Sequence, residues 1–86
     1  MGSVHLLYFA WLREQLGRSE ERLDLPPEVD RVDRLLRWLR QRDPALDSLA
    51  GSGRAIRVAV NQRFARDGDP VRAGDEVALF PPVTGG

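Results

Sequence analysis

The last two residues of the chain, Gly85 and Gly86, carry the clearest sign of chemistry in the sequence. Neither has a side chain, so a tail that ends in them can enter a channel too narrow for ordinary residues and present a bare terminal carboxylate. With a pKa of about 3.5, that carboxylate is ionised at neutral pH and can attack the α-phosphate of ATP. The resulting acyl-adenylate makes the Gly86 carbonyl electrophilic, and a sulfur donor can convert it into a thiocarboxylate. The alternative interpretation is a frayed chain end with two accidental glycines.

The residues before the two glycines give the tail its shape. Pro81 and Pro82 have no amide donor and favour an extended path. At about 3.3 Å per residue, the six-residue tail reaches roughly 20 Å. We expect the apolar group of Phe80, Pro81 and Pro82 to dock on a partner, and we expect Val83, Thr84 and Gly85 to enter that partner's active site.

Other reactive groups are few. The chain contains no Cys and no Lys, which excludes disulfides, thiolate ligands, persulfides and any side-chain amine for a Schiff base or an isopeptide bond. The single histidine, His5, alternates with apolar neighbours and has no partner constellation, so we interpret it as structural. Acidic pairs at 20–21 and at Asp67 and Asp69 fit solvated turns and edges better than a metal site, and we expect no bound metal.

Length and charge set the class of protein. The chain has 86 residues, enough for one domain, which we place at 1–80 with an extended tail at 81–86. Thirteen basic residues balance thirteen acidic ones, so no basic excess favours nucleic acid. No signal peptide is evident, and no apolar run approaches the ~20 residues that span a bilayer. We therefore expect a soluble, cytoplasmic protein.

Hydrophobic periodicity predicts alternating strands and helices. We expect a first strand at 4–9, buried on both faces, then a short helix at 10–16 and a second strand at 20–25. A long helix at 31–42 begins behind a cap from Asp30, and a loop follows at 45–53. Later strands are expected at 56–60, at 63–65 (a minor strand) and at 76–80. This order predicts an α+β protein: a mixed sheet with one long helix packed on one face and an extra short helix after the first strand.

Within the long helix, an apolar stripe every three to four residues predicts packing on the sheet. Arg34, Arg37 and Arg40 point away from that stripe, and we expect them to form a solvated face. Asp30 and Asp33 stand at the right spacing to pair with these arginines. We expect Trp38 to be partly buried and Trp11 to cover a sheet edge, while an interface role for either stays open.

Three segments resemble the small subunit of molybdopterin synthase: residues 8–14 (YFAWLRE), 59–62 (AVNQ) and 74–86 (GDEVALFPPVTGG). The last is the most specific. The resemblance covers nearly the whole chain and implies a ubiquitin-like β-grasp fold, from which we also take the strand pairing order. It implies that a ubiquitin-activating-type adenylyltransferase uses ATP to adenylate Gly86, and that the thiocarboxylate formed there supplies sulfur to the large subunit for the dithiolene of molybdopterin. No cofactor is expected on this chain alone, and neither nucleic acid nor membrane is an expected partner.

Three classes of function remain open at this point. The first is the sulfur carrier for molybdopterin. The second is a sulfur carrier for another product, such as the thiamine thiazole, although those carriers look shorter and lack the helix at 10–16. The third is a ubiquitin-like covalent modifier, because both chemistries need the same activated tail. In each case the chain is not a catalyst by itself, and whether it counts as an enzyme depends on counting it with its partner.

Overall fold

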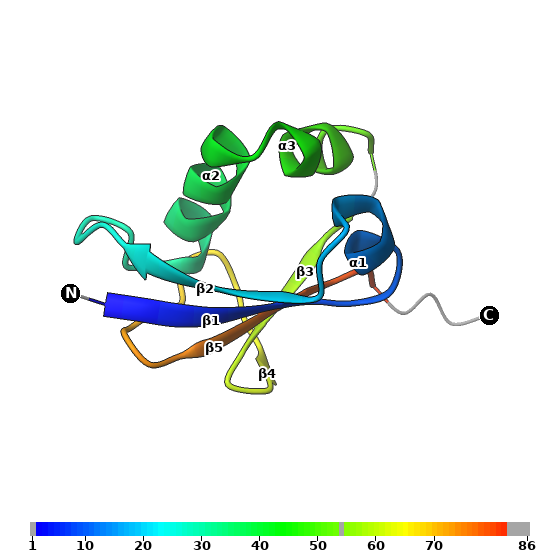
Figure 1. Cartoon of the computed structure of the whole chain (residues 1–86). Helices are drawn as coiled ribbons and strands as arrows, with labels where there is room; N and C mark the ends of the chain where they lie inside the picture. Colours follow the sequence, from blue (N-terminus) through cyan, green and yellow to red (C-terminus); the bar gives the residue numbers. More distant parts are fainter. Residues whose placement is uncertain (1, 54, 83–86) are drawn as a thin grey trace.

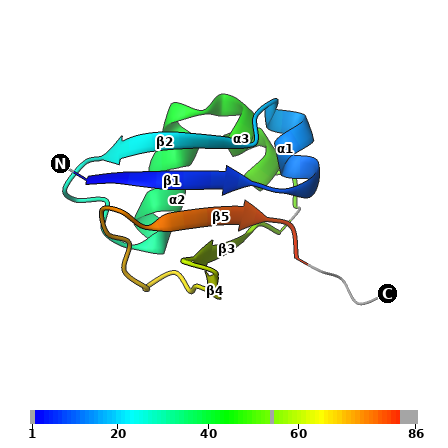
Figure 2. The same ribbon diagram turned by 60° about the horizontal axis from the view of Figure 1, so that its bottom comes forward.

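Five strands form one mixed sheet in the order β2-β1-β5-β3-β4, which Figure 2 shows from the side facing away from the helices. The computed structural model describes residues 2–53 and 55–82. β1 pairs antiparallel with β2 and parallel with β5, and β3 pairs antiparallel with both β5 and β4. The strands are β1 Gly2–Tyr8, β2 Glu20–Leu25, β3 Arg57–Val60, β4 Arg63–Phe64 and β5 Glu76–Phe80.

Helices cover one face of this sheet (Figure 1). They are α1 Ala10–Leu16, α2 Val32–Arg42 and α3 Pro44–Ala50. The core lies between the sheet and the side chains that α1, α2 and α3 turn toward it. Its largest fully buried side chains are Tyr8, Leu6, Leu12, Leu35, Leu39, Leu46, Leu79, Val4, Val32 and Val77. The expected α+β architecture with a mixed sheet is confirmed.

β1 is buried on one face only, so the expectation of two buried faces is wrong. Val4, Leu6 and Tyr8 are buried under the helices, whereas His5 and Leu7 are partly exposed. The apolar run at 4–9 looked like a doubly covered strand because Leu7 and Phe9 are apolar too. Among the described residues no helix covers the second face, and those side chains remain accessible there.

The beginning of α2 differs from the expected cap. The helix starts at Val32, Arg31 holds the N-cap position, and no side chain caps it. The first amides are instead satisfied by backbone carbonyls of the 67–69 turn: Val32 donates to Asp69 (3.0 Å) and Asp33 donates to Asp67 (2.9 Å). A carbonyl partner makes a side-chain cap unnecessary, and the Asp30 carboxylate accepts from Arg34 instead (2.9 Å).

Residues 45–53, expected as a loop, are largely the third helix. Asp43 ends α2 and also caps α3, where its Oδ1 accepts from the amides of Ala45 (3.0 Å) and Leu46 (3.4 Å). Pro44 occupies the first turn, where its missing amide costs nothing. Burial of Leu46 in the core then holds the short helix in place.

Other expectations agree closely. α1 and β2 have the expected bounds, and Gly17 ends α1 in the left-handed conformation with φ 73°. β3 and β4 are each shorter than expected by one residue. Arg34, Arg37 and Arg40 are exposed. Asp30 pairs with Arg34 as expected, whereas Asp33 pairs with Arg31 rather than with that stripe.

Both tryptophans are partly buried and pack against the core. The Arg42 guanidinium lies 5.4 Å from the centroid of the Trp38 ring. Across 2–53 and 55–82, no helix combines the length and the apolar character needed to cross a membrane.

Candidate functional site: the open face and the base of the tail

The tail leaves the sheet from its central strand. β5 runs parallel to β1, with Leu79 beside Tyr8, so both strands finish at the end of the sheet where α1 lies (Figure 1). The Phe9 amide donates to the Leu79 carbonyl (3.1 Å), which fixes the end of β5 beside the start of α1. Pro81 and Pro82 follow and are partly buried. The predicted site residues Val83, Thr84, Gly85 and Gly86 lie outside the described residues.

An apolar row crosses the open face, the face without helices. The strand register places Leu7 beside Ala78, Ala78 beside Ala59, and Ala59 beside Phe64. Because paired residues in a sheet point to the same side, these four side chains form a continuous row over β1, β5, β3 and β4. Phe64 ends the row and is 84% exposed, which is unusual for a large apolar side chain.

Phe80 joins this row at the base of the tail. Its ring centroid lies 5.8 Å from that of Phe64, at an interplanar angle of 47°. Phe80 lies two residues after Ala78 on β5 and therefore shares the open face, where it is partly buried. Phe9, two residues after Leu7, is 46% exposed. We call Leu7, Ala59, Phe64, Ala78 and Phe80 the apolar row.

Sequence reasoning predicted Phe80, Pro81 and Pro82 as docking residues and missed Phe64. A signal was present, since Phe64 is a lone aromatic residue, two positions after the 61–62 turn, in a stretch that is mostly polar. Both turn residues have positive φ, Asn61 at 51° and Gln62 at 69°, which is typical of the tight hairpin turns that match strand twist. This hairpin carries Phe64 onto the open face.

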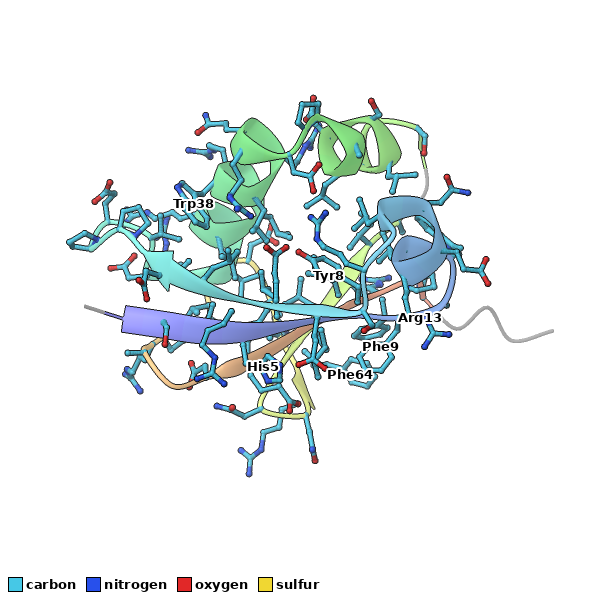
Figure 3. All side chains as sticks on the ribbon, in the orientation of Figure 1. His5, Tyr8, Phe9, Arg13, Trp38 and Phe64 are labelled. Carbon is cyan, nitrogen blue, oxygen red and sulfur yellow. The ribbon has the colours of Figure 1, made fainter. Side chains whose placement is uncertain are left out.

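His5 also lies on the open face (Figure 3), and its Nε2 is 2.7 Å from Glu20 Oε1. The strand register places Arg22 and Glu76 beside it. The chain has no Cys, and no group of three potential metal ligands occurs among the residues that the structure describes. His5 thus takes part in a surface hydrogen bond with Glu20, and it has no metal-ligand cluster around it in the described part of the chain.

On the helix side, a charged network joins β1, β2, the connection between α1 and β2, and the end of α2. Glu21 accepts hydrogen bonds from the Tyr8 hydroxyl (2.6 Å) and from Arg18 Nε (2.8 Å), and Arg42 Nη1 lies 3.5 Å from its other oxygen. Arg18 also bonds to Asp43 and lies over the Tyr8 ring at 5.1 Å. Each charged group has a partner, so the network ties the elements together.

The network shifts the pKa values of Tyr8, Glu21 and Asp43. Burial, followed by the hydrogen bond to Glu21, raises the pKa of Tyr8 to about 12. Burial acts to raise the pKa of Glu21, but the hydrogen bond from Tyr8 and the charge of Arg18 outweigh it and lower that pKa. For Asp43, burial is likewise outweighed by the Arg18 hydrogen bond and the capped amides, and its pKa is lowered. None of these groups is poised for acid–base chemistry near neutral pH.

Comparison with known proteins agrees with this geometry. The ThiS family profile matches residues 6–86. The molybdopterin synthase sulfur carrier subunit of Chlamydomonas reinhardtii is 36% identical over 85 residues, covering 96% of this chain and 98% of the relative. The crystal structure of SAMP1 from Haloferax volcanii superposes with a TM-score of 0.77 at 38% identity, covering 99% of this chain and all of the other.

A second solved structure shares the fold. It is a complex of subunits 1 and 2 of molybdopterin-converting factor from Helicobacter pylori, in which the matched chain is 21% identical with a TM-score of 0.65 and the match covers 98% of this chain and 99% of that one. A family profile over nearly the whole chain and a full-length curated relative above 30% identity lead to one assignment. The chain belongs to the ThiS family and is a β-grasp protein of the kind represented by the molybdopterin synthase sulfur carrier subunits.

Proposed function

We propose that this protein is the sulfur carrier subunit of a molybdopterin synthase and that Gly86 carries the sulfur. The observation that carries the proposal is the direct connection of a Gly-Gly tail to the central strand β5, next to the apolar row, which ends in the exposed side chain of Phe64. A central strand is hydrogen-bonded on both sides, so it gives the tail a rigid base. The similarity to a curated sulfur carrier subunit supports this reading.

The chemistry takes place at the terminal carboxylate. The ionised carboxylate of Gly86 attacks the α-phosphate of ATP, and pyrophosphate leaves. A sulfide donor then attacks the acyl carbon of the adenylate, AMP leaves, and a thiocarboxylate remains. ATP belongs to the activating enzyme, which we take to be an adenylyltransferase of the ubiquitin-activating type. This chain supplies the reacting carboxylate and binds no cofactor of its own.

The open face provides the contact with the large subunit. In this arrangement Phe80, Pro81 and Pro82 pack on the partner together with Phe64, while Val83, Thr84 and Gly85 extend into its active site. Exposed aromatic side chains surrounded by polar ones are typical of partner sites. The H. pylori structure is described as a complex of subunit 1 with subunit 2 of molybdopterin-converting factor. We place the reaction in the cytoplasm, with neither nucleic acid nor membrane as a partner.

A second function has a specific observation in its favour. The Haloferax volcanii neighbour at 38% identity is SAMP1, described elsewhere as small archaeal modifier protein 1. A modifier would join the activated Gly86 to an amine of another protein instead of receiving sulfur. Both functions start from the same adenylate, so they differ only in the product that forms from it. A carrier stays mostly free, and a modifier gives a ladder of conjugates on other proteins.

The intact mass after incubation with an activating enzyme, ATP and a sulfur source tests the proposal. We expect a gain equal to the exchange of one oxygen for sulfur, located on Gly86 by peptide mapping. Two variants serve as controls: one lacks Gly86, and one has a residue appended after it. Both should fold normally but fail to support ATP–pyrophosphate exchange. Undiminished exchange with the extended protein would contradict a reaction at the terminal carboxylate.

A further inference from the structure

A hollow opens beside the base of the tail, between β3, β4 and the end of β5. Its volume is about 550 Å³. The Phe64 and Phe80 rings, 5.8 Å apart, contribute its aromatic surface. Its lining includes Arg57, Phe64, Ala65, Arg66, Phe80 and Pro82, with no acidic residue among the side chains that line it.

Two arginines of this hollow lack a charged partner. Arg57 pairs with Phe80 across the strands, and both Arg57 and Arg66 are exposed. No carboxylate of the described residues forms an ion pair with either guanidinium. Asp69, the acidic group bonded nearby, accepts from the Arg66 backbone amide (2.9 Å) rather than from its side chain. Among the other described arginines, five form ion pairs and five do not; the first group is Arg18, Arg31, Arg34, Arg40 and Arg42, and the second is Arg13, Arg22, Arg37, Arg63 and Arg72. Arg57 and Arg66 differ from the rest of the second group because both line this hollow beside the two aromatic rings.

Guanidinium groups beside aromatic rings are well suited to bind a carboxylate at a protein interface. Arginine is weakly hydrated and binds carboxylates with two parallel hydrogen bonds, and it is enriched in protein interfaces relative to the rest of the surface. The hollow is continuous with the apolar row through Phe64 and Phe80. The four residues beyond Pro82 reach up to about 13 Å, so the chemistry at Gly86 can proceed away from this hollow.

We propose that the hollow receives an acidic side chain of the large subunit, whose carboxylate pairs with Arg57 and Arg66 while the apolar row packs beside it. This inference rests on the proposed function, because it names a contact of the same docking face. The two ion pairs fix the orientation of the complex and speed its formation, as complementary charges at the rim of an interface generally do. The tail then enters the partner from a defined direction.

Charge reversal tests this contact. The affinity of the cognate large subunit is measured by calorimetry, and the association rate by stopped flow, for the wild type, Arg57→Glu, Arg66→Glu and the double variant. We expect each single change to weaken binding about fivefold at low ionic strength, because an attractive exposed pair becomes a repulsive one. Added salt should weaken the wild-type complex and strengthen that of the double variant, because it screens an attraction in the first and a repulsion in the second.

Arg37→Glu is the matched control. Arg37 is exposed on α2, on the helix side of the sheet, and forms no ion pair with any described residue. The substitution Arg37→Glu changes the net charge by the same amount as Arg57→Glu or Arg66→Glu, and we expect it to bind the large subunit with wild-type affinity. Arg57→Gln and Arg66→Gln remove the charge without reversing it. Their affinities for the large subunit should therefore lie between that of the wild type and those of the charge-reversed variants. Thermal unfolding of every variant separates a folding defect from a binding defect.

Several results would contradict the proposed contact or the proposed function. Unchanged affinity in the reversed variants, or an equal loss in Arg37→Glu, overturns the proposed contact while the proposed function stands. Saturable AMP binding by the free protein, with shifts at Phe64 and Arg57 in NMR spectra, would make the hollow a phosphate site and also overturn it. A wild-type chain that binds no large subunit at all would instead contradict the proposed function itself.

Discussion

Phe64 and Phe80 touch on the open face, but the fold depends on them to different degrees. Phe64 is 84% exposed on the short strand β4 at the edge of the sheet. Phe80 is partly buried at the end of β5, which has neighbours on both sides. Truncating Phe64 removes little buried area, whereas truncating Phe80 removes packing from the centre of the sheet.

At the residue scale, we predict that Phe64→Ala separates binding from stability. The complex with the large subunit should weaken by more than about 1 kcal/mol, as expected for an aromatic anchor. The free energy of unfolding should change by less than about 0.5 kcal/mol, because the side chain is mostly exposed. Calorimetric titration and chemical denaturation measure the two quantities.

Phe80→Ala is the comparison. It should weaken the complex by a similar amount and also lower the free energy of unfolding. If Phe64→Ala binds as tightly as the wild type while keeping native circular dichroism, the apolar row is not the docking surface.

Among the elements, the junction between α2 and α3 concentrates several roles on Asp43. Its carboxylate caps α3 through the amides of Ala45 and Leu46 and also binds Arg18, which reaches over from the connection between α1 and β2. Only 15% of the Asp43 side chain is exposed. One residue therefore joins two consecutive helices to a segment that lies 25 residues earlier in the sequence.

We predict that Asp43→Ala lowers the free energy of unfolding by about 2 kcal/mol, since it removes a helix cap and leaves Arg18 without one of its acceptors. Asp43→Asn should cost less, because an amide oxygen still caps the helix. Asp24→Ala, at an exposed position of β2, is the control and should be nearly neutral. Urea unfolding measures all three, and equal losses for Asp43→Ala and Asp24→Ala would contradict the assigned role.

The same carboxylates predict a loss of stability in acid. The pKa values of Glu21 and Asp43 are lowered in the folded state. Their contribution is therefore fully present above the ordinary carboxylate range near pH 4 and is lost as the pH falls through the lower folded values. The thermal midpoint should drop steeply below about pH 4. A double variant with Glu21→Gln and Asp43→Asn should start lower and fall less, and a parallel fall would point to other groups.

For the molecule as a whole, the absence of lysine limits the attachment of an activated tail to a second copy of this chain. All thirteen basic residues are arginine, so no side-chain amine on this chain can form an isopeptide bond. The α-amine, with an ordinary pKa of about 7.8, is the remaining acceptor. It belongs to Met1, which directly precedes β1 in the sequence, and we expect this closeness to the strand to hinder attack on a bulky activated terminus.

We therefore predict that incubation with an activating enzyme and ATP yields adenylate or thiocarboxylate but no self-linked ladder on a denaturing gel. Substituting an exposed arginine of the helix face, Arg37→Lys, supplies an amine and serves as the positive control for ladder formation. Dimers of the lysine-free chain that survive boiling and reductant, with a peptide joining Gly86 to Met1, would favour the modifier function over the carrier function.

The sequence by itself determined the elements whose signals are local. The Gly17 stop, the Asn61-Gln62 turn and the heptad-like stripe of α2 depend on neighbouring residues, and each appears where expected. The Gly-Gly tail and the aromatic residue at its base, Phe80, were evident for the same reason. The strand order followed from the family resemblance, because pairing between distant strands leaves little trace in one sequence.

Tertiary structure alone decided which face each apolar residue occupies and which partners the helix ends find. Phe64 is exposed and Leu7 is partly exposed because no helix among the described residues covers their face, and the alternation of residues in the sequence does not show which face is covered. α2 has no side-chain cap because carbonyls more than thirty residues away in sequence take its first amides. Long-range contacts replace local ones at these points, and local patterns therefore mispredicted the Asp30 cap and the two-sided burial of β1.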